Sequence, residues 1–318
     1  MAAQKLAVII PAFNEEKTIA EVVQAVPRKI EGISSVKIIV VDDGSVDKTI
    51  QKARNAGADF IELHETNKGL GVAFRTGIEK AIESGADIIV NIDADGQFNA
   101  QDIPKLISPI LNNQAEVVTC SRFKEKALAP KMPWIKRFGN NLFTWLVNYL
   151  TGERFTDTQC GFRAYTREAA LRLTLFGKFT YTQEALLDLV YKGFRVKEVA
   201  LEVKGERSTG KSRVVEHWYS YGVKALLIMV RAVRDHHPLR FFGGIGFVFL
   251  LAGGISALVL LVRLLVKHVI TPYTWVAYAD IVLIVVGFLL IVLALIADMW
   301  DRQRKIQEEI LYRLKKGN

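Results

Sequence analysis

The chain has 318 residues, of which half are apolar, a net charge of +9 and only two cysteines. This length allows one large domain with an appendage, and the two distant cysteines argue against a disulfide or zinc framework. The positive charge would suit nucleic acid, phosphorylated ligands or an anionic membrane, but two long apolar segments favour the membrane and argue against nucleic acid.

The first hundred residues alternate short apolar runs with helical patterns. The expected elements, in chain order, are a strand at 6–10, a helix at 17–25, a strand at 36–41, a helix from near Ser45 or Asp47, a strand at 58–63, a helix at 72–84 and a strand at 88–92. This alternation is typical of βαβ units and a mostly parallel sheet. Residues 11–15, 42–45 and 93–97 would then meet at one edge, where open α/β sheets bind ligands.

The last of these strands ends in two acids one residue apart. Asp93 and Asp95 supply carboxylates at i and i+2, and Gln97 adds an amide oxygen at i+4. Hard oxygen ligands of this kind suit Mg²⁺ or Mn²⁺ carrying the phosphates of a nucleotide. A solvated acidic turn is the alternative that these residues alone leave open.

The middle of the chain carries a further strand at 117–120 and a helical pattern at 131–151. That pattern begins with cations that include Arg137 and continues as an apolar face with Trp and Tyr. A helix lying on a membrane fits this composition, and a core helix is the alternative. Another helix is expected at 181–191.

The apolar segments at about 241–262 and 278–298 each approach the roughly 20 residues that cross a bilayer. We expect a two-span hairpin over 239–299, preceded by an amphipathic linker at 214–238 and followed by a charged tail at 300–318; buried core helices are the alternative. Lysines and arginines cluster outside both spans, so the positive-inside rule predicts that both termini and the preceding domain are cytoplasmic. Self-association would run through the hairpin.

Four ordered motifs carry a family resemblance: VIIPAFNEE, VVDDGSVDKT, NKGLGVAFRTG and NIDADGQ. Together they resemble the inverting family 2 glycosyltransferases of GT-A fold, and most of all the dolichyl- or polyprenyl-phosphate hexose synthases. The resemblance extends to about Val214, because Phe155–Tyr165 is similar to the family's D-x-x-x-GFR segment and Arg207–Ser212 to its R-x-x-G-x-S segment. It implies a GT-A catalytic domain over 1–213.

The resemblance also implies roles for individual residues. Asp42 or Asp43 would contact the base, and Asp93, Asp95 and Gln97 would hold the metal. The expected donor-site set is Pro11, Ala12, Asn14, Glu15, Asp42, Asp43, Lys68, Gly69, Asp93, Ala94 and Asp95.

A second implied set surrounds the acceptor. Arginines would hold two anions close together, because guanidinium binds phosphate oxygens bidentately. Asp157 would orient a partner or act as a base. The expected acceptor-phosphate ligands are Arg122, Arg137, Arg163 and Ser212, and the expected catalytic set is Asp95, Asp157, Arg122, Arg163 and Arg207.

The expected reaction is metal-dependent transfer of a hexose, with inversion, from a GDP-mannose or UDP-glucose type of donor to dolichyl or polyprenyl phosphate. Processive polysaccharide synthases of the superfamily carry a Q-x-x-R-W segment. Gln183 does not begin such a segment, because Leu186 and Leu187 stand where the motif has Arg and Trp. Polymer synthesis therefore stays the second choice, beside transfer to a non-lipid acceptor and a membrane-anchored protein that only binds nucleotide sugars. The sequence selects neither the sugar nor the nucleotide.

Overall fold

The computed structural model describes residues 3–128, 134–175, 181–204, 230, 233–234 and 238–317. The chain forms two compact units, of which the first holds residues 1–226 and 312–318 and the second residues 227–311. Most of the expected linker at 214–238 lies outside the described residues.

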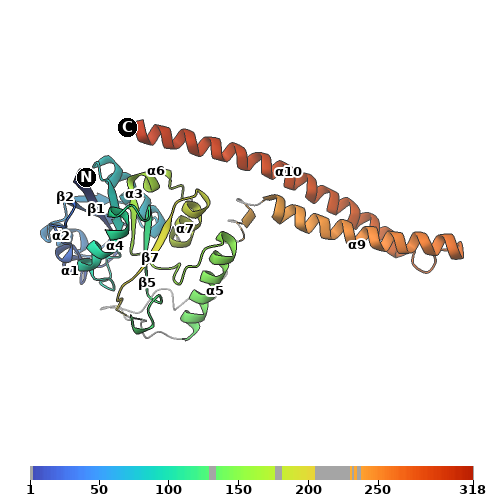
Figure 1. Cartoon of the computed structure of the whole chain (residues 1–318), viewed down its shortest axis with the longest axis horizontal. Helices are drawn as coiled ribbons and strands as arrows, with labels where there is room; N and C mark the ends of the chain where they lie inside the picture. The colour runs from blue at the N-terminus through green and yellow to red at the C-terminus, as the bar shows by residue number, and fades with distance from the viewer. Residues whose placement is uncertain are drawn as a thin grey trace. The chain divides into compact units, whose positions relative to one another are not determined.

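A seven-stranded sheet forms the centre of the first unit (Figure 1). The strand order is β3-β2-β1-β4-β6-β5-β7, and neighbours are parallel except that β6 runs antiparallel to β4 and β5. The expected mostly parallel sheet is confirmed, although β6 and β7 were not expected. The strands are β1 (Gln4–Ala12), β2 (Ile33–Asp42), β3 (Phe60–Leu63), β4 (Ile88–Asn91), β5 (Val117–Ser121), β6 (Arg163–Thr166) and β7 (Val196–Ala200).

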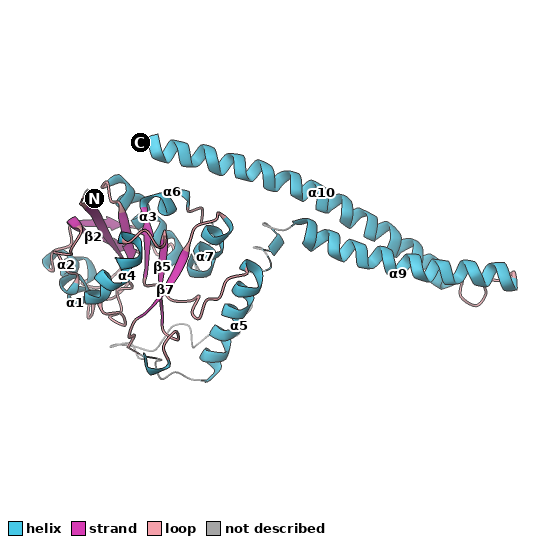
Figure 2. Ribbon diagram, viewed as in Figure 1, coloured by secondary structure: helices cyan, strands magenta, loops and turns pink. Residues whose placement is uncertain are grey.

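Helices cover both faces of this sheet, which explains why β1 is apolar at successive positions (Figure 2). Leu6 and Val8 belong to one buried cluster, and Ala7 and Ile9 to the other. A strand buried on both sides needs an apolar residue at each position. The first cluster includes residues of α1 (Ile19–Ala25), α2 (Thr49–Asn55) and α4 (Ile103–Leu111), and the second includes residues of α3 (Leu70–Glu83), α6 (Arg167–Arg172) and α7 (Tyr181–Tyr191).

Helix α5 (Trp134–Thr151) has two unlike faces. Phe143 and Val147 are buried, whereas Phe138, Trp145 and Tyr149 are 63%, 59% and 75% exposed. The helix therefore takes part in the core on one side and presents aromatic side chains on the other. Two short 3₁₀ turns, η1 (Ala100–Asp102) and η2 (Lys126–Leu128), are the other described helical elements between residues 3 and 204.

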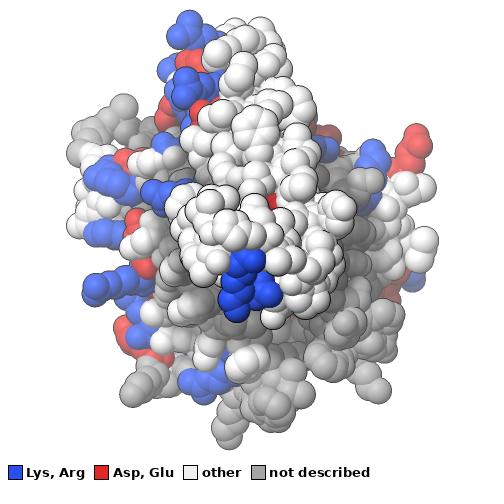
Figure 3. All heavy atoms as spheres, turned by 90° about the vertical axis from the view of Figure 1, so that its right-hand side faces the viewer, with Lys and Arg blue, Asp and Glu red and all other residues white. Residues whose placement is uncertain are grey.

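The second unit contains α9 (Pro238–Lys267), which is followed in the chain by α10 (Thr274–Gly317). Both helices are long and apolar enough to cross a membrane. Figure 3 views the hairpin from its turn, where uncharged atoms dominate apart from a small group of Lys and Arg atoms. Helix α10 also continues through the expected tail, where Lys305 pairs with Asp301 at 2.7 Å along the helix.

Small residues bring the two helices of the hairpin together. A Cβ placed on Gly246 would lie 2.8 Å from the carbonyl oxygen of Gly287, and one on Gly287 would lie 2.9 Å from that of Gly246. Gly253 is similarly close to Ile284. The backbones can approach this closely only because side chains are missing at these positions.

Candidate active site

A cavity of about 220 Å³ lies where β1, β2 and β4 end, and we call it the strand-end pocket. It brings together residues from the three loops that were expected to meet, with others from the start of α3. The described lining residues are Pro11, Ala12, Phe13, Glu15, Asp43, Asn67, Leu70, Ala73, Asp93, Ala94 and Asp95. The structure therefore places acids from separate strands at one edge of the sheet, as the βαβ pattern predicted.

Asp43 ties the strand-end pocket to the turn before α3. Its two carboxylate oxygens accept the backbone N–H groups of Lys68 at 2.9 Å and Gly69 at 2.8 Å. His64, which follows β3 and was not expected at the site, places Nδ1 2.7 Å from the same carboxylate and Nε2 3.0 Å from Thr76 Oγ1. Lys68 and Gly69 therefore meet Asp43 through their backbone.

Asp42 is more enclosed than its neighbour. Its side chain is buried, Oδ2 accepts the Ser45 N–H at 2.9 Å, and Oδ1 has no hydrogen-bond partner among the described residues. Asp43 lines the strand-end pocket and Asp42 does not. Of the two acids that the sequence offered as contacts for a base, Asp43 is the one at the cavity.

Two loops of the site are bound to each other through Asn14. This residue has a left-handed backbone with φ of 54°, which asparagine tolerates better than most residues. Its N–H donates to Ser45 Oγ at 2.9 Å, and its Oδ1 accepts the Val46 N–H at 2.9 Å. Asn14 therefore holds the loop after β1 against the loop after β2, while Glu15 lines the pocket.

Asp47 shows why the second helix begins later than either expected cap. Its Oδ1 accepts the N–H of Thr49 at 2.9 Å, and Oδ2 accepts the N–H of Glu16 at 3.2 Å. Although burial acts in the opposite direction, hydrogen bonds from Thr49 and Glu16 hold the pKa of Asp47 below its usual value. Residues 45–48 therefore form a turn, and α2 begins at Thr49.

Asp93 and Asp95 are the two acids of the pocket that follow β4. Asp95 is 6% exposed, and its Oδ1 accepts the Gln97 N–H at 3.1 Å. Among the described residues, no group of three or more His, Cys, Asp or Glu side chains could hold a metal ion unaided. Two carboxylates beside a cavity nevertheless fit Mg²⁺ or Mn²⁺, because such ions often take one or two carboxylates and complete their coordination with substrate phosphates and water.

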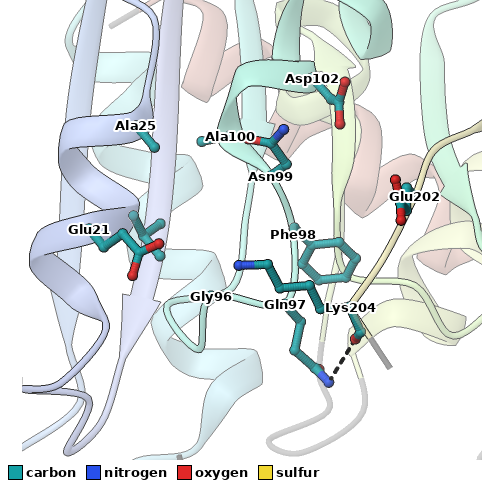
Figure 4. Close-up of a pocket in the computed structure, with 11 residues that line it drawn as sticks. Glu21, Ala25, Gly96, Gln97, Phe98, Asn99, Ala100, Asp102, Glu202 and Lys204 are labelled. Carbon is teal, nitrogen blue, oxygen red and sulfur yellow. Dashed lines mark hydrogen bonds between the residues drawn. The ribbon is translucent and has the colours of Figure 1, made fainter. Parts of the chain in front are cut away.

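Gln97 lies at a different cavity from the two acids. This second cavity, of about 410 Å³, is shown in Figure 4 and is lined among others by Glu21, Phe98 and Glu202. The Gln97 Nε2 lies 3.5 Å from the backbone oxygen of Lys204. The structure therefore does not bring Gln97 to the strand-end pocket, because the chain turns at Gly96, where φ is 72°.

Arg122 and Asp157 form a bidentate ion pair at the end of β5. Asp157 is fully buried, and its two oxygens lie 2.6 Å from Arg122 Nε and 2.9 Å from Arg122 Nη2. Although burial alone would lower it, this carboxylate raises the pKa of the Arg122 guanidinium. Asp157 also accepts the Gln159 N–H at 3.1 Å. This environment fits a residue that orients Arg122 and does not fit an accessible base.

Arg163 is placed differently from the expectation that it binds an acceptor phosphate. It is fully buried in β6, and its guanidinium donates to Thr119 Oγ1 at 3.2 Å, to the Thr158 carbonyl at 2.8 Å and to the Thr182 carbonyl. These contacts enclose all three guanidinium nitrogens in protein. The structure therefore contradicts the phosphate-binding and catalytic roles expected of Arg163 and indicates that it holds neighbouring segments together.

Arg137 and Arg122 approach the same aromatic ring. Their guanidinium carbons lie 5.9 Å and 5.4 Å from the ring centre of Phe123, within the range of cation–π contact. This ring brings two of the expected acceptor-phosphate ligands into one neighbourhood. Ser212, another expected acceptor-phosphate ligand, and Arg207, from the expected catalytic set, lie outside the described residues.

Glu198, on β7, is a residue that no sequence pattern indicated. Its carboxylate accepts the N–H of Thr156 at 2.8 Å, the N–H of Asp157 at 2.9 Å and the hydroxyl of Thr156 at 2.9 Å. Burial raises the pKa of this carboxyl. Glu198 therefore anchors the segment that carries Asp157, and a long-range contact of this kind leaves no local pattern in the sequence.

The mixed seven-stranded sheet, with acids at the ends of β2 and β4, is the GT-A fold. The same fold occurs in glucosyl-3-phosphoglycerate synthase from Mycobacterium tuberculosis, solved in complex with Mn²⁺, UDP and glucosyl-3-phosphoglycerate. That structure matches with a TM-score of 0.58 and 20% sequence identity, over 73% of this chain and 80% of its own.

Residues 7–174 match the family model described as glycosyl transferase family 2, so the chain belongs to this family. A similar protein from Methanococcus voltae, named UDP-N-acetylglucosamine–dolichyl-phosphate N-acetylglucosaminyltransferase, is 39% identical over 53% of this chain and 72% of its own length. A dolichyl-phosphate hexose transferase from Haloferax volcanii is 30% identical over 62% of this chain and 81% of its own. Glycosyltransferase AglJ, from the same organism, is 28% identical over 76% of each chain.

Proposed function

We propose that this glycosyltransferase transfers a hexose from a nucleotide-diphosphate sugar to dolichyl or polyprenyl phosphate, with inversion, and so forms a lipid-phosphate-linked sugar. The observation that carries the proposal is a pocket with Asp43, Asp93 and Asp95 in a chain that also has two helices able to cross a membrane. The names of two relatives, which refer to dolichyl phosphate, support the choice of acceptor.

The donor would occupy the strand-end pocket. Asp43 lies where it could accept hydrogen bonds from the base or ribose, and Asp93 and Asp95 are the residues that would hold Mg²⁺ or Mn²⁺. A bound divalent cation would supply positive charge to the leaving diphosphate. GDP-mannose and UDP-glucose are the donors expected from the sequence, and the Methanococcus relative adds UDP-N-acetylglucosamine to those to be tested.

The acceptor phosphate would bind near Arg122 and Arg137. A phosphate monoester is already negatively charged near neutral pH, because its second pKa is about 6. It therefore needs positioning more than it needs a general base. The buried ion pair with Asp157 suits this demand, since it fixes the Arg122 guanidinium in one orientation.

A lipid acceptor also explains the exposed apolar side chains of α5 and those of α9 and α10. On α5, Phe138, Leu142, Trp145 and Tyr149 follow one another at a spacing of three to four residues and are all exposed. Aromatic side chains of this kind favour a membrane interface. In this proposal α5 lies on the bilayer, α9 and α10 cross it, and the catalytic domain and both termini face the cytoplasm.

The experiment that tests the proposal uses the full chain in detergent micelles with dolichyl phosphate and Mn²⁺ or Mg²⁺. GDP-mannose, UDP-glucose and UDP-N-acetylglucosamine are supplied one at a time as radiolabelled donors. We expect one donor to give a labelled, organic-soluble product, and Asp95→Ala to abolish that product without changing the melting temperature by more than a few degrees. No lipid-linked sugar from any donor would refute the proposal.

The same assay separates the alternatives. Long water-soluble products would indicate a processive synthase, and sugar transfer without dolichyl phosphate would indicate a different acceptor. Donor binding without turnover would indicate a binding protein. EDTA should stop the proposed reaction and added Mn²⁺ should restore it.

A further inference from the structure

A buried hydrogen-bonded group lies beside Asp93 and has no assigned role. Asn91, the last residue of β4, is fully buried, and its Nδ2 donates to the carbonyl oxygen of Gly161 at 2.8 Å and to the hydroxyl of Tyr181 at 2.8 Å. Asn91 stands two residues before Asp93. It therefore joins the end of β4, which Asp93 follows, to two segments that are 70 and 90 residues further along the chain.

Gly161 is in direct proximity to the Asp93 carboxylate. A Cβ built on Gly161 would lie 2.9 Å from Asp93 Oδ2, 3.1 Å from Asp93 Oδ1 and 3.2 Å from the Tyr181 hydroxyl. The carboxylate and the hydroxyl therefore surround the same small space, which only glycine leaves open. Any other residue at position 161 would displace one of them.

The Tyr181 hydroxyl is itself held firmly in place. Tyr181 is 1% exposed, and its ring stacks on Phe74 with centroids 4.2 Å apart and planes 21° apart. The hydroxyl accepts the Asn91 amide, so its position is fixed by both the stacked ring and the hydrogen bond. A phenylalanine would keep the stacking but would leave one buried Asn91 N–H without this acceptor.

We propose that Tyr181 is a positioning residue for the metal site: with Asn91 and Gly161 it fixes the place and orientation of the Asp93 carboxylate. The inference rests on the proposed function in one respect, namely that Asp93 and Asp95 bind a divalent cation. Tyr181 itself touches neither the cation nor the sugar. Removing the Tyr181 hydroxyl weakens metal binding because the Asp93 carboxylate, which would bind the cation, is then held less firmly.

Tyr165 offers a matched control for this role. It is also fully buried, and its ring lies 6.0 Å from the same Phe74, but its hydroxyl interacts with Arg163, whereas the Asn91 amide donates to the hydroxyl of Tyr181. Tyr165→Phe and Tyr181→Phe therefore each remove one phenolic oxygen from the same aromatic cluster. Only the second change disturbs the neighbourhood of Asp93.

The test titrates the full chain in detergent with Mn²⁺, both alone and with UDP or GDP, and follows free Mn²⁺ by electron paramagnetic resonance. Tyr181→Phe should raise the Mn²⁺ dissociation constant about tenfold, the size expected for a partner of a metal ligand, and Tyr165→Phe should leave it unchanged. Saturating Mn²⁺ should restore the turnover of Tyr181→Phe. Gly161→Ala, which acts on Asp93 directly, should weaken Mn²⁺ binding at least as much.

Melting temperatures measured on the same samples separate positioning from general packing. Two outcomes of the titration would overturn the inference: a wild-type Mn²⁺ dissociation constant in Tyr181→Phe, or an equal weakening of Mn²⁺ binding in Tyr181→Phe and Tyr165→Phe. A wild-type chain that binds no Mn²⁺ would also overturn it. Should Tyr181→Phe fail to fold, Asn91→Ala, which removes the amide that holds the Tyr181 hydroxyl, takes its place and should weaken Mn²⁺ binding to a similar extent. Mn²⁺ binding that depends on Tyr181 but accompanies no lipid-linked product would refute the proposed function and leave this inference standing.

Discussion

The first unit uses its aspartates in two different ways, as a pair beside the strand-end pocket and as a single buried residue beside Arg122. Asp93 and Asp95 line a cavity at the ends of the parallel strands, whereas Asp157 is fully buried and both of its oxygens contact Arg122. The first group suits a cation that arrives with a substrate because it borders a cavity, and the second is paired with an arginine of the protein. Aspartates in one fold can therefore be assigned to ligand binding or to orientation by what already surrounds them.

The loops around these acids differ in the same sense. On the pocket side, backbone N–H groups of residues 45, 68 and 69 donate to Asp42 and Asp43, so the carboxylates hold the loops. On the other side, the Glu198 carboxylate accepts the backbone N–H of Asp157 and so holds the segment that carries the buried acid. Removing single members from each side tests this difference.

The largest effect is expected where the buried pair is broken. Asp157→Ala leaves the Arg122 guanidinium mostly buried without its carboxylate, and such losses cost about 3–5 kcal/mol. We expect the melting temperature of the full chain in detergent to fall by about 10 °C. The control is Asp102→Ala, which removes the exposed pair with Lys105 and should cost less than about 1 kcal/mol. Equal losses in the two variants would contradict the assigned role of Asp157.

A smaller effect is expected on the pocket side from Gly44→Ala. Gly44 has a φ of 80°, and a Cβ there would lie 2.8 Å from the backbone of Thr66. The left-handed backbone alone costs about 1–2 kcal/mol for a residue with a Cβ. We expect a several-fold rise in the KM for the donor, because the loop that carries Asp43 must shift. Thermal melting and initial-rate measurements on the same sample would show both changes.

The control for Gly44→Ala is the same substitution at Gly139, where a Cβ would meet nothing within 4 Å. Gly139 lies inside α5, so alanine should stabilise the helix by about 0.5–1 kcal/mol and leave the KM for the donor unchanged. A Gly44→Ala variant with wild-type KM and wild-type melting temperature would show that the close approach to Thr66 is not needed.

The smallest effect is a pH dependence at Glu198. Burial raises the pKa of Glu198 in the folded protein, so the folded state holds this proton more firmly than the unfolded state. Stability contributed by this group is therefore lost as the pH rises from about 4.5 through the folded pKa. The melting temperature of Glu198→Gln, measured relative to wild type, should rise over this range, because glutamine does not ionise.

Glu116→Gln is the control of opposite sign. Hydrogen bonds from Arg195 lower the pKa of Glu116, so its contribution is present above pH 4.5 and is lost as the pH falls through the folded pKa. The melting temperature of this variant relative to wild type should therefore fall as the pH rises from strongly acidic values toward about 4.5. The same trend in both variants would show that the surroundings of Glu198 are not as described.

The parts of the fold that could be predicted are those in which local pattern and burial agree. Residues 6–10 and, apart from Asn91, residues 88–92 are apolar runs between polar residues because β1 and β4 are covered on both faces. The convergence of residues 11–15, 42–45 and 93–97 followed from parallel connectivity alone. Strand β7 was missed because Lys197 and Glu198 interrupt its apolar residues, and the strand is fixed by pairing with β5.

The predicted site was less complete, for a related reason. The resemblance selected Arg163 by its place in a motif, but only the folded chain shows that its guanidinium is enclosed by three carbonyl or hydroxyl oxygens. His64, Tyr181 and Glu198 act on partners far away in sequence, so no spacing pattern could indicate them. Roles that depend on which partner lies nearby need the tertiary structure.

The glycines of the hairpin have a consequence for how its surface can vary. Since α9 and α10 meet backbone to backbone at Gly246 and Gly287, with Gly253 against Ile284, much of their bulk of leucine, valine and isoleucine is turned outward. Those outward side chains contribute little to keeping the pair together, so one aliphatic residue can replace another there with hardly any penalty. The three glycine positions, by contrast, admit no such exchange, because a single methyl group there would push α9 and α10 apart.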